Sequence, residues 1–468
     1  MKKVIGLVFI GFLFSGILFA QESKSAESDA KKTETVKLSI EEAVEYALKN
    51  SRTLKSSDID LELKERAAKN SWNVFLPDIS ASGTMMRASE ISPQYAAAGL
   101  DDYPDEESRW DVVGKIGASW TFAPAYIVNI KKAKVEYENG KITWEQTQRE
   151  TITNIKKHYY RLLLQQESLK IKKTSLENAR QRMNQAATNF KNGAIPEIQY
   201  LQTQVNYENT KPEVDSAEQD LVQQIDMLAF MIGMPVGTKI ELTSSIEPTF
   251  VEVDADELLA EYSGNNLKIQ ALEKNKLAAK LGVTAGDMST WIPSLVVNYA
   301  WNPMYMNGSQ MGVASGNAKA FGFAGDIGDD EKWYNSGNLT LTLAWNLTNM
   351  LPWSKTRQQV KDGKQQLAKL EISIETAKEN QKVEVRKAVD TLNQAREQID
   401  SMARNVTVAQ RAYDMSVRSY RNGTMELLDL RDAESSLNQA KLGYVTQKFQ
   451  YISALMDLEN TLNTDLTK

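Results

Sequence analysis

Two aspartates three residues apart, Asp429 and Asp432, are the side chains in this 468-residue sequence best placed to act together. They follow an Asn-Gly pair at 422–423 and open a segment with helical periodicity, so both carboxylates fall on one helix face. The start of a helix also favours negative charge. The pair predicts either a site that attracts cations or the ordinary placement of acids in the first turn of a helix.

Other groups of reactive side chains give weaker indications. The sequence contains no cysteine, which excludes disulfides, thiolate metal sites and a lipid anchor on an N-terminal cysteine. His158 is the one histidine, and we expect it to pack beside Tyr159 rather than bind a metal. Methionines at 304, 306 and 311 could bind a soft metal, but simple packing is the favoured interpretation. With no nucleophile–base arrangement and no phosphate-binding glycine loop, the sequence predicts no enzyme, no cofactor and no metal.

The first residues have the layout of a secretory signal. Lys2 and Lys3 precede an apolar stretch from Val4 to Phe19, and the small residue Ala20 follows it, so we expect residues 1–20 to be cleaved. A membrane anchor is the alternative, but the stretch is short for a spanning helix. Residues 21–37 are polar and are expected to be a disordered lead-in. Acidic and basic residues are interspersed along a chain of net charge −6, so nucleic acid is not an expected partner.

Long helices are predicted by apolar residues that recur at every seventh position. One ladder of such residues repeats 230 positions later, which indicates an internal duplication. Each ladder ends at an Asn-Gly turn, so each turn is expected to join two antiparallel helices. The first rod is predicted from Ile127 to Phe190, and Pro212 is expected to kink or split its return helix. The two ladders are Ile155, Leu162, Leu169, Leu176, Met183 and Phe190, and Val385, Leu392, Ile399, Val406, Tyr413 and Tyr420.

The duplication divides the chain into two repeats, residues 38–251 and 252–468, with hairpin tips near 190–196 and 420–425. The first repeat opens with Ser39 followed three residues later by Glu42, the pattern of a capping box. That pattern predicts a helix from Ser39 to about Val74. Each repeat is expected to hold a helix, a pair of strands and a long helical hairpin.

Four segments alternate apolar and polar residues with the period of a strand: 79–85, 110–122, 291–301 and 336–345. Their length and their small polar second face favour a membrane barrel over a soluble sandwich. No apolar run after residue 20 is long enough for a membrane helix, so β-structure is the remaining way to span a bilayer. An aromatic girdle at the membrane boundaries is predicted from Trp110, Trp120, Trp291, Trp301 and Trp345.

Four strands cannot close a barrel, and an open sheet edge in lipid leaves backbone groups unpaired. The chain is therefore expected to form oligomers. Two copies give eight strands, whose side chains nearly fill the interior, whereas three copies give twelve strands and an aqueous lumen.

The sequence resembles the TolC-type outer-membrane efflux proteins over nearly all of the mature chain. The resemblance is carried by the order and duplication of several segments rather than by one motif. It implies an α+β membrane protein: a trimeric twelve-stranded barrel, four strands per chain, continued by an α-helical coiled-coil tunnel through the periplasm. The segments are "LSIEEAVEYALKNS", "FLPDIS", "WIPSL", "GMPVGTKIEL" and "YRNGTMELLDLRDAESSLNQAKLGY".

The resemblance also implies roles for individual residues. The turns containing Asn192 and Gly193, and Asn422, Gly423 and Thr424, match the periplasmic tips where an adaptor docks and a gate acts. Asp429, Asp432 and Tyr420 match residues that narrow the periplasmic entrance. Met425 stands where the family has a gate arginine, so the closing contact is expected to differ.

The function implied is an outer-membrane exit duct of a tripartite efflux or type I secretion system, which passively conducts substrates delivered by an inner-membrane pump. The expected partners are two further copies of the chain, a periplasmic adaptor, the pump and outer-membrane lipid. Two alternatives come from other classes. A periplasmic coiled-coil adaptor or scaffold would share the hairpins but not the four strands, and an outer-membrane enzyme would need a catalytic cluster.

Overall fold

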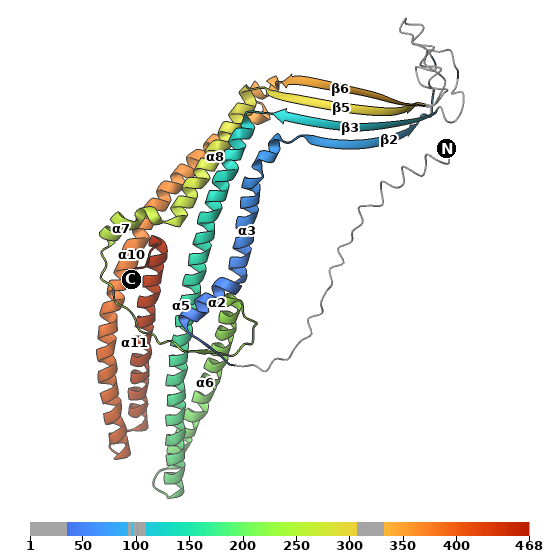
Figure 1. Ribbon diagram of the computed structural model, residues 1–468. Helices are drawn as coiled ribbons and strands as arrows, with labels where there is room; N and C mark the ends of the chain where they lie inside the picture. The colour runs from blue at the N-terminus through green and yellow to red at the C-terminus, as the bar shows by residue number, and fades with distance from the viewer. Residues whose placement is uncertain (1–34, 92–95, 97–100, 102–108, 307–331, 468) are drawn as a thin grey trace.

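The computed structural model describes residues 35–91, 96, 101, 109–306 and 332–467. A four-stranded sheet lies at one end of an elongated molecule, and long helices run from it to two hairpin tips at the other end (Figure 1). Within this described part, no helix combines the length and apolar character needed to cross a bilayer. The predicted signal at 1–20 and Met311 lie outside the described residues.

The sheet joins the two halves of the chain. It contains β2 (Asp78–Arg87), β3 (Trp110–Phe122), β5 (Ser294–Met306) and β6 (Lys332–Ala344) in the order β2-β3-β5-β6. All three pairings are antiparallel, and β3 pairs with β5 across the boundary between the halves. The four strands predicted from alternation are therefore confirmed, with β5 and β6 each 13 residues long.

The register gives this sheet one apolar face and one polar face, because directly paired residues of antiparallel strands share a face. On the polar face, the Ser119 hydroxyl donates to Asn298 Oδ1 at 2.7 Å. One apolar row contains Ile79, Ala118, Tyr299 and Leu339, and the adjacent polar row contains Asp78, Ser119, Asn298 and Thr340.

Two helices extend from the sheet to the tips, and both have 67 residues: α5 (Ala125–Lys191) and α10 (Lys355–Arg421). At 1.5 Å per residue each is about 100 Å long. Near the sheet they pack with α3 (Arg52–Lys69) and α8 (Leu267–Trp291). Toward the tips they pack with α6 (Glu197–Ile232) and α11 (Leu427–Leu462), which both have 36 residues. The predicted first rod and both helical hairpins are thus confirmed.

The heptad ladders are buried most completely in the middle of the molecule. Ile155 and Leu162 of α5 and Val385 of α10 are fully buried, whereas Phe190 at the tip is 38% exposed. The packing of the first hairpin therefore tightens away from its tip, whereas in the second hairpin Leu430 and Leu437 of α11 are already buried close to the tip.

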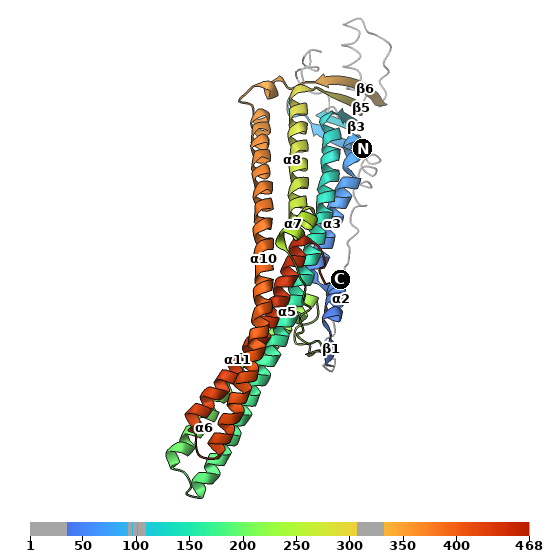
Figure 2. The same cartoon turned by 90° about the vertical axis from the view of Figure 1, so that its left-hand side faces the viewer.

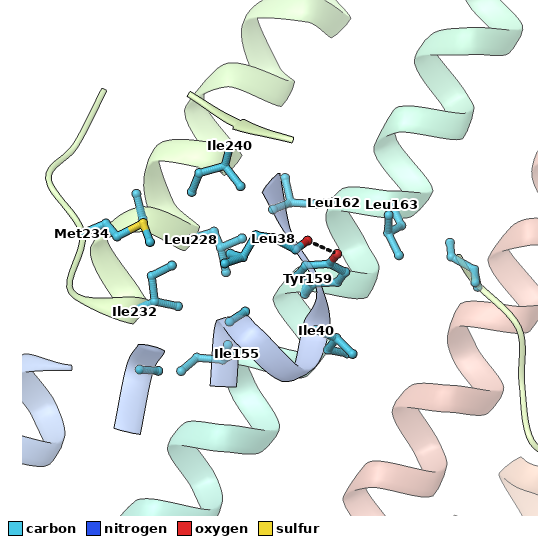
Figure 3. Close-up of a cluster of buried hydrophobic side chains, with 14 of the residues drawn as sticks. Leu38, Ile40, Ile155, Tyr159, Leu162, Leu163, Leu228, Ile232, Met234 and Ile240 are labelled. Carbon is cyan, nitrogen blue, oxygen red and sulfur yellow. Dashed lines mark hydrogen bonds between the residues drawn. The ribbon is translucent and has the colours of Figure 1, made fainter. Parts of the chain in front are cut away.

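A central cluster surrounds Tyr159 of α5, and Figure 3 shows the side chains that converge on it. Its hydroxyl donates to the carbonyl oxygen of Leu38 at 2.7 Å and accepts from the backbone N–H groups of Thr243 and Ser244. Leu38 ends β1 (Val36–Leu38), which pairs in parallel with β4 (Ile240–Leu242). One phenol thus holds two segments that are distant in sequence.

A second cluster holds the connection between the repeats. Residues 243–254 cross α11, where the Val251 N–H donates to the Tyr451 hydroxyl at 2.9 Å and Phe250 contacts the Tyr451 ring edge-on. The chain then enters α7 (Ala255–Tyr262) and η3 (Ser263–Asn265). Figure 2 shows α7 beside α8 and α10.

Several expectations need correction. The helix that starts after Ser39 has the predicted capping box but ends at Asn50, so α2 (Ile40–Asn50) is separate from α3. A β-carbon on Gly233 would lie 2.3 Å from the Asn50 carbonyl oxygen, which shows how closely the end of α2 meets the end of α6. After α3 comes η1 (Ser71–Phe75), not further α-helix.

Two smaller corrections concern single segments. Residues 21–34 of the predicted disordered lead-in lie outside the described residues, and its last part, Val36 and Lys37, instead pairs with β4 as part of β1. Pro212 does not split its helix, because α6 is continuous from Glu197 to Ile232.

Candidate functional site

The two hairpin tips have the same backbone geometry. Gly193 and Gly423 adopt the left-handed conformation, with φ of 69° and 73°, directly after the helix caps Asn192 and Asn422. At the second tip the N–H of Gly423 donates to the Tyr420 carbonyl, and the N–H of Thr424 donates to the Ser419 carbonyl, both at 3.0 Å. This pair of bonds is a Schellman motif, and glycine fits its left-handed position without a β-carbon penalty. The positive φ predicted for both glycines is confirmed.

The side chains around the tips differ. At the first tip Phe190 stacks on Tyr200, with ring centroids 5.9 Å apart, across the two arms of the hairpin. At the second tip the Thr424 hydroxyl donates to the Ser419 carbonyl at 3.1 Å. The first tip is therefore fixed by an aromatic pair and the second by a hydroxyl cap.

Asp429 and Asp432 lie on α11 just beyond the second tip. Asp429 is in the first turn of the helix, Asp432 is one turn further on, and both are exposed. Tyr420 is half-buried on the opposite arm, in the last turn of α10, and Met425 is half-buried in the turn between them. The structure thus brings the three predicted entrance residues to one hairpin end.

A buried ion pair that the sequence analysis missed joins the two hairpins above the tips. Arg182 of α5 donates to Glu434 Oε2 of α11 at 2.7 Å, and Asn178 donates to Oε1 of the same carboxylate at 2.8 Å. The Arg182 and Glu434 side chains are only 11% and 7% exposed. Asn178 also donates to the Tyr413 hydroxyl of α10 at 3.3 Å, so the contact spans three helices.

Burial raises the pKa of Tyr413, and the nearby Glu434 carboxylate adds to the effect. The phenol therefore stays neutral and accepts the Asn178 hydrogen bond at physiological pH. The sequence does contain a signal for this site. Glu434 stands four residues after Leu430 and three before Leu437, two buried apolar residues of the seam, where an acid is unexpected.

Further polar contacts follow the same boundary between α5 and α11. Lys157 forms an ion pair with Asp457, and Asn463 donates to Glu145 at 3.5 Å. Buried amide oxygens of Gln165 and Gln447 have no hydrogen-bond partner within the described residues. Apolar contacts cross the same boundary in the middle of the molecule, where Ile452 of α11 is buried in the cluster around Tyr159. The boundary is therefore mixed in the middle, and toward the tips it is joined by the Arg182–Glu434 ion pair.

The tryptophans predicted for a girdle occupy two kinds of position. Trp110 and Trp120 lie on β3 and Trp301 on β5, all on the apolar face of the sheet. Trp291 does not belong to a strand: it ends α8, and the guanidinium of Arg357 lies 5.6 Å from its ring centre. Trp345 follows the last residue of β6. Three other exposed tryptophans near the ends of the strands were missed: Trp72, Trp333 and Trp353, at 53%, 56% and 74% exposure.

The weaker candidates behave as packed residues. His158 is 9% exposed, and its Nε2 donates to the Gln224 carbonyl at 2.9 Å. Met304 lies within β5 rather than in a loop.

The structure thus combines an amphipathic four-stranded sheet with two long helical hairpins, and comparison with known proteins shows which family has this combination. A family model described as "Outer membrane efflux protein" matches residues 43–234 and again 258–464. The chain belongs to this outer membrane efflux protein family. It is accordingly an outer-membrane protein that extends into the periplasm, and its family consists of channel proteins rather than enzymes.

Individual relatives are distant in sequence and similar in fold. Nodulation protein T of Rhizobium leguminosarum bv. trifolii is 21% identical over 391 residues, which cover 82% of this chain and 77% of that protein. The CmeC outer membrane channel of Campylobacter jejuni is 17% identical and superposes with a TM-score of 0.69, covering 90% of this chain and 85% of CmeC. VceC of Vibrio cholerae gives a TM-score of 0.68 at 15% identity, covering 91% of this chain and 96% of VceC.

Proposed function

We propose that this protein is the outer-membrane exit duct of a tripartite efflux or type I secretion system. It works as a homotrimer and passively conducts substrates from an inner-membrane pump, through a periplasmic adaptor, to the outside. The amphipathic sheet with two open edges is the observation that carries the proposal. Equal helix lengths in the two halves support an internal duplication behind this architecture.

The barrel follows from the edges of the sheet. The order β2-β3-β5-β6 leaves one side of β2 and one side of β6 without a strand partner within the described part of the chain. Leu339, Leu341 and Leu343 of β6 are 63–71% exposed on the apolar face. Pairing β6 of one copy with β2 of the next satisfies the backbone and repeats until a ring closes. Three copies give twelve strands with a wet lumen.

Tryptophans are proposed to mark the membrane boundaries of that barrel. Trp110 marks the end far from the helices, and Trp120 lies near the helix end of the same strand. Trp301 pairs with Ile116 halfway along β3, so it faces the apolar side at mid-strand and not at a boundary as expected. Trp291 and Trp345 stand where the chain passes between helix and sheet. Their indole rings suit the boundary between lipid headgroups and acyl chains.

The tips are proposed to dock with the adaptor. Asn192, Gly193, Asn422, Gly423 and Thr424 are exposed, and the Schellman turns hold their backbone in a fixed shape. Gly423→Val strains the left-handed position by about 1 kcal/mol or more and changes the docking surface. Adaptor co-purification and export should fall, while Gly264→Val, at another glycine with open space around it, should have no effect. Undiminished export by a correctly assembled Gly423→Val trimer would contradict the docking role.

The entrance is proposed to be lined by Asp429, Asp432 and Tyr420 from each copy. Three copies bring six carboxylates together, and a ring of like charge concentrates cations and repels anions. In a planar bilayer the wild-type channel should prefer cations and be blocked by trivalent cations from the periplasmic side. Replacing both aspartates with alanine should remove both properties, and Asp400→Ala, at an exposed acid higher on α10, should leave them unchanged. An unchanged ion preference in the double variant would reduce the pair to ordinary helix-start acids.

Closure is proposed to depend on the Arg182–Glu434 contact, which lies above a tip that has Met425 where the family has an arginine. This contact ties the first hairpin to the second inside one chain. Single-channel recording of Glu434→Gln should show longer open times than wild type, because the neutral amide weakens the bond to Arg182.

A periplasmic adaptor or scaffold without a barrel is the alternative function. The two functions share the hairpins, but a scaffold has no need of an exposed apolar sheet face. Solubility of the mature chain without detergent would favour the scaffold, and trimers with channel conductance in detergent and lipid would exclude it.

A further inference from the structure

Three arginines on the lower part of α10 form an exposed column. Arg404, Arg411 and Arg418 recur at seven-residue spacing, so they lie on one helix face. That face is opposite the seam residues Val406 and Tyr413. None of the three arginines has an ion pair among the described residues, and the neighbouring carboxylate of Asp414 accepts a hydrogen bond from Gln410 instead. Three like charges in one line call for an acidic partner.

The return helix of the first hairpin carries a matching acidic column. Glu208 and Asp215 of α6 are also seven residues apart and exposed, and neither has an ion pair within the described ranges. Leu201 and Val222 continue the same column at its two ends and are 43% and 59% exposed. The column lies on the side of α6 away from α5, because the buried residues Thr203 and Val214 face α5.

Both columns lie at the free sides of the chain. In the lower half the helices are arranged in the order α6, α5, α11, α10, as Figure 1 shows, with α5 packed on α6 and α11 packed on α10. The acidic column is therefore at one outer side and the arginine column at the other. Within one chain they cannot meet.

The buried Glu434 contact fixes how high each column stands. Glu434 bonds to Asn178 and Arg182, so residue 180 of α5 lies at the level of Glu434. The antiparallel helices α5 and α6 meet at the first tip. Glu208 is as many residues from the start of α6 as residue 180 is from the end of α5, so these two residues lie at the same level. In the second hairpin, Glu434 is as many residues from the start of α11 as residue 414 is from the end of α10, so Glu434 and residue 414 lie at the same level. Glu208 therefore lies at the level of residue 414, and Asp215 lies at the level of residue 407. Glu208 thus falls midway between Arg411 and Arg418, and Asp215 midway between Arg404 and Arg411.

We infer that α6 of a second copy of this chain packs antiparallel on α10 through a ladder of alternating charges. The order along the ladder is Arg418, Glu208, Arg411, Asp215 and Arg404, with successive charges about 5 Å apart along the axis. Val205, Val408 and Met415, at 58%, 64% and 65% exposure, supply apolar contacts beside it. The inference rests on the proposed ring of copies and names the side chains that join its lower half.

This ladder makes the lower subunit boundary sensitive to salt, whereas the barrel is not. Exposed ion pairs weaken as salt screens them, but strand pairing in lipid does not depend on such screening. The hairpins of neighbouring copies can therefore separate while the trimer stays assembled.

A cysteine crosslink tests the inference, because the chain has no cysteine of its own. Val205→Cys together with Met415→Cys places two thiols at nearly the same level on facing helices. Mild oxidation should give covalent dimers and trimers in denaturing gels. The matched control, Val205→Cys with Val383→Cys, uses a similarly exposed site far up α10 and should give monomers.

Charge reversal identifies the ladder itself. In the crosslinking background, R404E with R411E and R418E should slow dimer formation at least about tenfold, because each attractive pair becomes repulsive. E208R with D215R should do the same, and the five changes together should restore the wild-type rate.

Each other result counts against the inference. The inference is overturned if the variant with all five charge reversals does not recover the wild-type rate of crosslinking. It is also overturned if assembled trimers never crosslink between positions 205 and 415. If reversing the arginines leaves crosslinking unchanged but abolishes adaptor co-purification, the column binds an acidic adaptor instead. A wild-type chain that is monomeric in detergent would overturn the proposed trimeric duct, a result distinguishable from loss of the crosslink alone.

Discussion

Below the Tyr159 cluster, the contact inside each hairpin is mainly apolar, whereas the contact between the two hairpins is mainly polar. Inside the second hairpin, Leu392 and Ile399 of α10 are 2% and 4% exposed and pack against buried apolar residues of α11. Between the hairpins, α5 meets α11 through Lys157–Asp457 and Arg182–Glu434. An apolar seam loses stability wherever it is opened, whereas a polar seam can exchange its partners for water.

The difference divides the lower half of the molecule into two stiff hairpins and one separable boundary. Each hairpin is expected to move as a unit, because its apolar interior holds the arms together. Below the Tyr159 cluster, relative movement of the hairpins costs mainly the polar contacts between α5 and α11, and water replaces most of their hydrogen bonds. At the cluster itself, Ile452 of α11 is buried against α5 and holds the hairpins together. Substitutions in the two kinds of seam can test this division.

The largest effect is expected inside a hairpin. Leu392→Ala removes a fully packed side chain and leaves a cavity, which should lower the free energy of unfolding by about 2–5 kcal/mol. Denaturant unfolding in detergent, followed by helical circular dichroism, measures this loss. Val383→Ala, at a 65% exposed position on the same helix, is the control and should change stability little. Equal losses in both variants would mean that the seam is not a tight core.

The next effect belongs to the boundary. Glu434→Leu leaves the Arg182 guanidinium buried without its partner and should cost about 3 kcal/mol. Replacing both residues with leucine removes the unpaired charge, so the double variant should recover most of the loss. If the double variant is as unstable as the single variant, then the attraction between Arg182 and Glu434 holds the hairpins together, and the loss in the single variant does not come from the unpaired buried arginine.

A smaller effect should depend on pH. Burial raises the pKa of Glu459, near the end of α11, above its ordinary value of 4.5, although the backbone N–H of Leu466 donates to its carboxylate. Because the folded pKa is above the unfolded one, this group costs stability as pH rises from the unfolded to the folded value. Glu459→Gln should therefore raise Tm at pH 7.5 and leave it unchanged at pH 4. The exposed Glu257→Gln is the control, and a gain at both pH values would refute burial of the charged carboxylate as the cause.

The smallest effect is expected at the surface. Lys276 and Glu371 form an ion pair at 2.8 Å between α8 and α10, with side chains 40% and 58% exposed. The hydrogen bond and charge of Lys276 lower the pKa of Glu371. Its contribution is present above the ordinary carboxyl pKa and is lost as pH falls through the lowered value. Glu371→Gln should leave Tm at neutral pH nearly unchanged. A large decrease in Tm would show that this exposed ion pair stabilises the protein as much as the contacts between α5 and α11.

Local sequence signals predicted the elements well. The first rod was expected from Ile127 to Phe190 and runs from Ala125 to Lys191. The prediction was close because the apolar heptad repeat and the Asn-Gly turn that ends the helix are both local sequence patterns. The same holds for the Ser39 capping box and the left-handed tip glycines. The predicted docking, entrance and girdle roles depend on neighbouring molecules and stay predictions.

Long-range contacts were the part that the sequence did not reveal. The helix break at Ser51 follows from the end of α2 meeting Gly233, which is distant in sequence. Trp291 was assigned to a strand because its period fits one, but α8 continues through it to a contact with Arg357. Glu434 was overlooked because its partner Arg182 comes from the other repeat.

The pairing of β1 with β4 also sets an order of folding. The N–H of Ile40, the first residue of α2 after β1, donates to the Ser244 hydroxyl, which lies 204 residues later in the chain. All of β2, β3, α5 and α6 lies between these partners. The N-terminal strand therefore has no template until the first hairpin has been made and folded back, and closing so large a loop is entropically costly. Although β1 leaves the ribosome first, it is expected to be among the last segments of the first repeat to reach its final position.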